Sequence, residues 1–209
     1  MKRVALLGDS ITEYMPYIID KEAKRGFNVP LITTKIPSSD VIFYICGVSN
    51  IGVGNYHKYA WKRVEKDKID CFVLLIGINN ILRPDCDCDG KESLDDVFEK
   101  MKLFIQDVIT SGKDILVELL YPTSDIDINK KVIIINQKLK KYCEENNIDY
   151  LDLYNILLGV DGLINDNYTD DGLHPNEYCY MIIIEHISNK IKLVKRGWVS
   201  FTRFDNISW

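Results

Sequence analysis

Long hydrophobic segments are absent from this sequence of 209 residues. None of its apolar runs approaches the ~20 residues that a membrane-spanning helix requires, so we expect no membrane span. The basic pair Lys2 and Arg3 precedes only four apolar residues before Gly8, whereas the apolar region of a secretion signal has about 7–15. These two absences together predict a cytoplasmic protein.

Cysteine and positive charge are also scarce. The six cysteines lie mostly in apolar segments, which is typical of buried free thiols in a reducing compartment. The 26 basic residues are outnumbered by 31 acidic ones, and the net charge is −5. This balance disfavours a nucleic-acid partner, which would select for a basic surface. Internal repeats, low-complexity segments and flexible linkers are missing, so the length favours a single domain.

Five short apolar segments have the character of buried strands. They lie at residues 4–7, 41–46, 71–76, 115–120 and, more weakly, 150–153. Their hydrophobicity is continuous rather than alternating, which predicts strands covered on both faces, as in a parallel sheet.

The segments between these strands have apolar residues at helical spacing. The clearest predicted helices cover residues 94–111, 129–147 and 176–194, and weaker patterns cover 12–25 and 56–66. Ser93 is the expected N-cap of the first, with Asp96 completing a capping box. Alternating strands and helices predict a three-layer α/β/α fold around a central, parallel, five-stranded sheet.

The C-terminal segment differs from the rest of the chain. Residues 1–194 are expected to form the domain, and residues 195–209 carry aromatic side chains without a clear period. The aromatic residues are Trp198, Phe201, Phe204 and Trp209. We expect this tail to pack on the domain or at a partner interface, which would allow a homodimer.

Polar motifs follow several of the predicted strands. They are Gly8-Asp9-Ser10, Gly47-Val48-Ser49-Asn50, Gly77-Ile78-Asn79-Asn80 and, before the last helix, Asp171-Gly172-Leu173-His174. In parallel α/β sheets ligands bind beyond the carboxyl ends of the strands, so these motifs are expected to meet at one edge.

These residue types are the components of acyl transfer. A serine hydroxyl such as that of Ser10 needs a base, which His174 supplies, and Asp171 can orient that base and stabilise its charged form. The backbone amides of Ser10 and Gly47 and the side-chain amide of Asn79 are candidate donors for an oxyanion. Taken singly, each motif also fits a structural role as a cap or a turn.

The four motifs in this order resemble the blocks of the GDSL/SGNH hydrolases, and the resemblance spans the chain up to the closing helix. It implies a flavodoxin-like fold with no metal or organic cofactor. It also implies that Ser10 is the nucleophile, His174 the base and Asp171 its partner, with Ser10, Gly47 and Asn79 in the oxyanion hole and Asp9 in support. The sequence departs from the family at Asn80, where an aspartate is usual, and we expect Asn80 to keep a supporting role.

Several features allow other interpretations. Gly52 and Gly54 are alternatives to Gly47 as the second-block glycine. The segment Asp85-Cys86-Asp87-Cys88-Asp89-Gly90 resembles the start of a calcium loop, although an acidic loop overhanging the site is the simpler interpretation. His57 could face the cleft, whereas His186 is expected to be structural.

The sequence therefore predicts a serine esterase or acylhydrolase that acts on a short-acyl or carbohydrate ester through an acyl-enzyme. Two alternatives use the same fold. One is an O-acyltransferase that passes the acyl group to a sugar hydroxyl, and the other is a binding module without catalysis.

Overall fold

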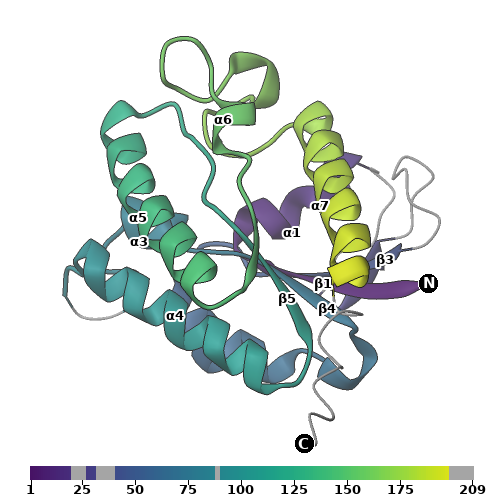
Figure 1. Ribbon diagram of the computed structural model, residues 1–209. Coiled ribbons are helices and arrows are strands. Elements are labelled where there is room, and N and C mark those ends of the chain that lie inside the picture. Colours follow the sequence, from purple (N-terminus) through teal and green to yellow (C-terminus); the bar gives the residue numbers. More distant parts are fainter. Residues whose placement is uncertain (20–26, 32–40, 88–89, 198–209) are drawn as a thin grey trace, which may run out of the picture.

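The structure is a computed structural model that describes residues 1–19, 27–31, 41–87 and 90–197 (Figure 1). Its strands form one six-stranded sheet in the order β2-β3-β1-β4-β5-β6. The strands are β1 (Lys2–Gly8), β2 (Val29–Leu31), β3 (Val41–Gly47), β4 (Cys71–Leu75), β5 (Asp114–Glu118) and β6 (Asp149–Leu151). Five of them run parallel, and β2 pairs antiparallel with β3.

The five predicted strands are all present, and β2 is an addition to the predicted sheet. It has only three residues, and one of them is Pro30. Proline cannot donate a hydrogen bond and is confined to sheet edges, so this short edge strand gives almost no pattern in the sequence. The order of the five parallel strands is that of a flavodoxin-like sheet.

The helices follow the predicted alternation, with shifted ends. They are α1 (Ser10–Ile19), α2 (Val53–Asn55), α3 (Ile78–Leu82), α4 (Leu94–Thr110), α5 (Ile126–Glu145), α6 (Tyr154–Leu157) and α7 (Glu177–Gly197). The weak pattern at 56–66 forms a π-helix (Tyr56–Ala60) and a 3₁₀ turn (Trp61–Arg63), after which Val64 returns to extended backbone. The part of the predicted helix 12–25 beyond residue 19 lies outside the described residues.

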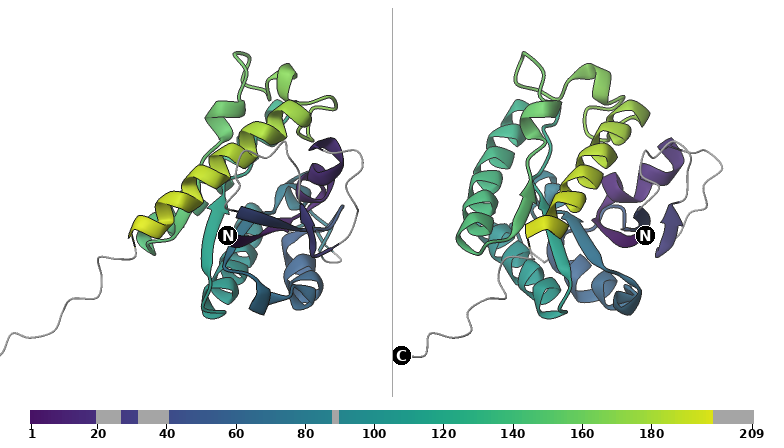
Figure 2. Two further views of the ribbon diagram at one scale, coloured as in Figure 1. Left: turned by 90° about the vertical axis from the view of Figure 1, so that its right-hand side faces the viewer. Right: turned by 45° about the vertical axis from the view of Figure 1, so that its right-hand side comes forward.

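The helices cover the sheet in two layers. Helices α1 and α7 pack together on one face, and α4 and α5 cover the other face with the helical segment 53–63 (Figure 2). The predicted capping box of α4 is present: the Ser93 N–H donates to the Asp96 carboxylate, and the Asp96 N–H donates to Ser93 Oγ. The apolar stripe of α4 is buried at Val97, Met101, Phe104, Ile105 and Val108, as helical spacing requires.

Helix α7 runs to Gly197, beyond the predicted domain end at residue 194. The rest of the predicted aromatic tail lies outside the described residues, so its packing and the homodimer stay predictions. Within the described parts of the chain, none of the helices combines the length and apolarity needed to cross a membrane.

The two helices on the α7 side are joined by a buried hydrogen bond. The hydroxyl of Tyr180 on α7 donates to the carbonyl of Ile11 at the start of α1, at 2.5 Å, and Tyr180 is fully buried. This contact connects the C-terminal helix to the turn that follows β1.

Replacing Tyr180 with phenylalanine should lower the free energy of unfolding by about 1–2 kcal/mol, because the Ile11 carbonyl loses its buried donor. Urea unfolding measures this difference. The matched control is Tyr178→Phe, whose side chain is exposed and whose hydroxyl should contribute within ~0.5 kcal/mol. Equal unfolding free energies for both variants would contradict the proposed link.

Candidate active site

The carboxyl ends of three neighbouring strands meet at one edge of the sheet. Gly8 at the end of β1 pairs in register with Gly47 of β3 and with Leu75 of β4. The motifs that contain Ser10, Gly47 and Asn79 therefore begin close together in space at this edge, as the sequence predicts. The fourth motif comes from the loop before α7.

The side chains of Ser10, His174 and Asp171 form one hydrogen-bonded series. Ser10 Oγ lies 2.9 Å from His174 Nε2, and His174 Nδ1 lies 2.7 Å from Asp171 Oδ2. A carboxylate can only accept, so Nδ1 carries the ring hydrogen and Nε2 is left to accept from the Ser10 hydroxyl. This is the tautomer that a general base for serine requires.

The turn around Asp171 holds this carboxylate in place beside the His174 imidazole. The backbone N–H groups of Leu173 and His174 donate to Asp171 Oδ1, at 2.9 and 2.7 Å. Gly172 adopts a φ of 81°, which favours glycine, and the Thr169 hydroxyl donates to the His174 carbonyl. Partial burial raises the pKa of Asp171, but the hydrogen bonds from His174 and Leu173 outweigh it and lower the pKa to about 2. Asp171 is therefore ionised at neutral pH.

Asp9 caps the helix that begins at Ser10. Its Oδ1 accepts from the Ile11 N–H at 3.1 Å, which satisfies one of the unpaired donors at the start of α1. The N–H of Ser10 belongs to the same first turn, where backbone donors and the helix dipole favour negative charge. An oxyanion formed at Ser10 would lie in this field.

Asp9 is also a buried carboxyl group. It is 1% exposed, and within the described residues its Oδ2 has no hydrogen-bond partner. Burial raises the pKa of Asp9 to about 7, against the opposing effects of the Ile11 N–H and of His174. Its ionised form therefore costs the folded protein free energy above neutral pH.

Asn79 lies in α3, directly after the turn that ends β4. Gly77 enters this turn with a φ of 126°, which side chains rarely adopt. The Asn79 Nδ2 donates to the Ile51 carbonyl at 3.1 Å, and its Oδ1 accepts from Arg83. The bond to Ile51 uses one of the two amide hydrogens, and within the described parts of the chain the other has no protein acceptor.

Gly47 has a packing reason to be glycine. A Cβ atom at this position would overlap the backbone of Glu13 in α1. The next residue, Val48, donates its N–H to the Gly8 carbonyl at 3.0 Å, so by the alternation of a parallel ladder the N–H of Gly47 faces the other side of β3. Its role in an oxyanion hole stays a prediction. Glu13 also accepts from the backbone and hydroxyl of Ser49, which holds the loop after β3.

Gly52 and Gly54, the alternative glycines, contact the acidic loop instead. A Cβ atom at Gly52 would overlap the Asp87 carboxylate, and the Gly54 N–H donates to Asp87 Oδ2 at 2.7 Å. Asn80 is 1% exposed and donates its amide to Asp87 as well. Asp87 thus lies under the loop after β3 and uses both oxygens for protein donors, which does not fit the calcium interpretation.

The remaining candidates lie away from Ser10. His57 Nε2 is hydrogen-bonded to Asp107 and the ring stacks on Phe104, so it does not reach the predicted site. His186 lies within α7. Among the described residues, no three metal-binding side chains are grouped.

Two residues outside the four motifs lie near these elements: Tyr14 contacts His174, and Asp87 contacts the loop after β3. The Tyr14 ring lies 5.3 Å from the His174 ring, centroid to centroid, four residues after Ser10 on the same helix. Helical spacing from Ser10 could have indicated Tyr14. Asp87 could have been found only by pairing it with the unusual Asn80.

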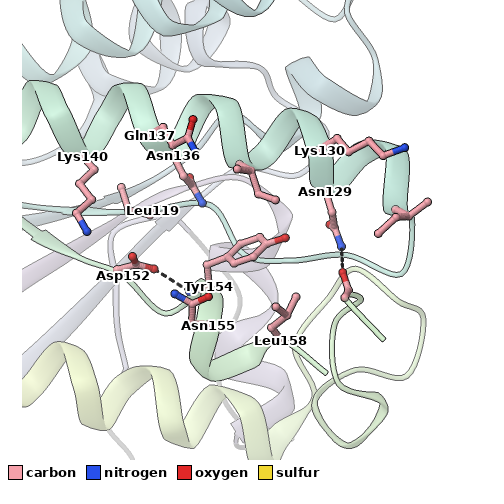
Figure 3. A pocket seen from close by; sticks show the side chains of 13 residues that line it. Leu119, Asn129, Lys130, Asn136, Gln137, Lys140, Asp152, Tyr154, Asn155 and Leu158 are labelled. Atoms are coloured by element: carbon pink, nitrogen blue, oxygen red, sulfur yellow. Dashed lines mark hydrogen bonds between the residues drawn. The ribbon is translucent and has the colours of Figure 1, made fainter. Parts of the chain in front are cut away.

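A separate pocket lies on the α5 side of the sheet. Its volume is about 490 Å³, and it opens between α5 and the segment 152–162 (Figure 3). Two of its amide side chains, Asn129 and Asn136, are already bonded to the backbone of Thr123 and Leu120. Because Ser10 and His174 do not line it, this pocket is distinct from the candidate active site.

Comparison with known proteins identifies the family of this chain. The sequence model of the GDSL-like lipase/acylhydrolase family matches residues 6–182, and the chain belongs to this family. Membership makes it an enzyme that hydrolyses carboxylic esters. Among curated proteins, none matches the sequence.

Solved structures share the fold at low identity. A putative acylhydrolase from Bacteroides fragilis has a TM-score of 0.73 at 20% identity, covering 92% of this chain and 88% of that one. A GDSL-like lipase from Bacteroides thetaiotaomicron has a TM-score of 0.74 at 18% identity, covering 92% and 89%. The acetylxylan esterase Axe2 from Geobacillus stearothermophilus has a TM-score of 0.67 at 18% identity, covering 91% and 94%.

The burial of Asp9 predicts a pH-dependent stability. Its pKa is raised on folding, so its contribution is full at acidic pH and is lost as the pH rises through about 7. Asp9→Asn removes this titration. The unfolding free energy of the variant minus that of the wild type should therefore be higher at pH 8 than at pH 5, by on the order of 3 kcal/mol. Urea unfolding at both pH values tests this.

The control for this prediction is Asp67→Asn, a substitution at an exposed aspartate. It should follow the wild type at both pH values. An Asp9→Asn difference that stays constant between pH 5 and pH 8 would show that Asp9 does not titrate in that range.

Proposed function

We propose that Ser10, His174 and Asp171 form the catalytic triad of this ester hydrolase. The observation that carries the proposal is the hydrogen-bonded series from Ser10 Oγ through the imidazole to Asp171, in the tautomer that serine activation needs. Asp171, with its pKa lowered to about 2, remains a carboxylate that can stabilise a charged imidazolium.

The reaction follows from these positions. His174 Nε2 takes the proton from Ser10 Oγ as that oxygen attacks the ester carbonyl carbon. The oxyanion is stabilised by the Ser10 N–H at the start of α1 and by the second amide hydrogen of Asn79. The imidazolium then protonates the departing alcohol, which leaves an acyl group on Ser10.

The second half repeats these steps with water. His174 removes a proton from a water molecule that attacks the acyl-enzyme, the Ser10 ester bond breaks, and Ser10 Oγ regains its proton. The His174 side chain is 25% exposed and that of Asp171 is 54% exposed. Water therefore has access to the base, which favours hydrolysis over transfer to a sugar hydroxyl.

For the substrate we propose an ester with a short acyl group on a small alcohol or a carbohydrate. Support comes from the acetylxylan esterases that share the fold.

Ser10→Ala and His174→Ala should each lower kcat for p-nitrophenyl acetate by at least about 10³-fold. The double variant should lose no more than either single variant, because the two groups act as a unit. Ser111→Ala, a control at the end of α4, should keep the wild-type rate. Full activity of Ser10→Ala would refute the triad.

A series of p-nitrophenyl esters from acetate to decanoate tests the acyl preference. We expect kcat/KM to fall as the chain lengthens, with acetate or butyrate hydrolysed fastest. Product analysis with an acetylated xylooligosaccharide tests whether a carbohydrate ester is a substrate. A free sugar added as a competing acceptor tests whether the acyl group is transferred rather than hydrolysed. A maximum at decanoate would overturn the short-acyl proposal, and acyl transfer outpacing hydrolysis would favour the acyltransferase.

A further inference from the structure

Four polar side chains form a buried group under the loop that follows β3. We call Asn80, Asp87, Glu92 and Lys100 the Asp87 cluster. The side chains of Asp87 and Glu92 are 0% and 5% exposed, and that of Lys100 is 30% exposed. Lys100 forms an ion pair with Glu92 and lies 3.6 Å from Asp87. Residues 88–89, between the two acids, lie outside the described residues.

The amide of Asn80 joins the two acids. Its Nδ2 donates to Asp87 Oδ2 and to Glu92 Oε2, both at 2.8 Å, and its Oδ1 accepts from the Val53 N–H at 2.9 Å. Both amide hydrogens and the amide oxygen of Asn80 therefore have hydrogen-bond partners. A carboxylate at position 80 could keep only the bond from Val53, since it has no hydrogen to donate.

Asp87 extends this support along the loop. Its two oxygens accept from the Gly54 and Asn55 N–H groups at 2.7 and 3.0 Å. Together with Asn80, it therefore satisfies three successive backbone donors, at residues 53–55. These are the first N–H groups of the helical segment that starts at Val53, where negative charge is stabilising.

The same loop holds the Asn79 amide. The carbonyl that accepts from Asn79 Nδ2 belongs to Ile51, which directly precedes Gly52. Gly52 lies against the Asp87 carboxylate, with no room for a Cβ atom. A shift of Asp87 would therefore move residues 51–55 and with them the acceptor that orients Asn79.

We propose that Asp87 is a positioning residue, which orients the Asn79 amide through residues 51–55, and that a neutral residue at position 80 is required by this arrangement. The inference rests on the proposed role of Asn79 as an oxyanion donor. Asp87 comes from the acidic loop after α3 and supplies the buried negative charge, so a second charge at position 80 would repel both Asp87 and Glu92 at close range. This accounts for the departure from the family at Asn80.

The decisive experiment exchanges the two side chains. Asn80→Asp and Asp87→Asn should each lower kcat for p-nitrophenyl acetate by about 10²-fold with KM within about 2-fold, because a misplaced oxyanion donor weakens only the transition state. The double variant Asn80→Asp/Asp87→Asn restores the number of charges. It also restores a donor–acceptor pair, with the amide now at position 87 and the carboxylate at position 80. Its kcat should be at least about 10-fold higher than the kcat of Asn80→Asp.

A second variant leaves the four side chains of the cluster unchanged. Gly52 has ordinary extended backbone angles, with φ −88° and ψ 170°, so alanine is not strained there by its backbone. In Gly52→Ala the methyl group overlaps the Asp87 carboxylate and Cys86 Sγ and displaces the loop that carries both, and kcat should again fall with little change in KM. Asp85→Asn, at an exposed residue of the same loop, is the control and should keep the wild-type kcat. Thermal unfolding of each variant confirms that the folded enzyme is being assayed.

The outcomes separate two failures. Activity in Ser10→Ala would refute the proposed function itself. An inactive Ser10→Ala together with wild-type kcat in Asp87→Asn or in Gly52→Ala would overturn only the positioning role. A double variant no more active than Asn80→Asp, or a loss expressed in KM rather than kcat, would overturn it as well.

Discussion

The parallel pairing of β1 with both β3 and β4 is the constraint on which the site depends. This central strand aligns Gly8 with Gly47 on one side and with Leu75 on the other, so three chain segments leave the sheet at the same level. Each segment then turns into a helix or a loop that carries one polar group. A slip of one residue in either pairing would turn the side chains that follow to the opposite face and separate those groups.

The acidic and amide side chains around this edge differ in their burial and in the hydrogen-bond donors around them. Asp171 is surrounded by donors and keeps its charge, as its pKa of about 2 reflects. Asp9 is fully buried, and within the described residues one of its oxygens has no donor, so burial raises its pKa to about 7. Beneath the neighbouring loop, an uncharged Asn80 shares its hydrogens between two acids. Burial and the number of available donors together decide whether a negative charge is retained at each place.

Much of this architecture could be predicted from the sequence. The five parallel strands are fully covered and therefore continuously apolar, and the four motifs identify the residues that meet at the sheet edge. The short edge strand around Pro30 was not predictable, because three residues give no periodic pattern. The contacts of Asp87 were also hidden, since its backbone partners lie 32 and 33 residues away and become neighbours only through β4. The calcium-loop pattern reflects the spacing of the acids along the chain and contains no information on their burial.

The separation of Ser10 and His174 along the chain has a consequence for biosynthesis. The two residues are 164 positions apart, and Tyr180, which fastens the last helix to the first, is 169 positions from Ile11. During synthesis the N-terminal strands and the proposed nucleophile emerge long before the proposed base, so in the proposed mechanism Ser10 stays unactivated until the last helix has docked. A chain that stops before residue 174 would hold all six strands of the described sheet, and the proposed mechanism gives it no esterase activity. The time at which activity appears therefore reports when folding is complete.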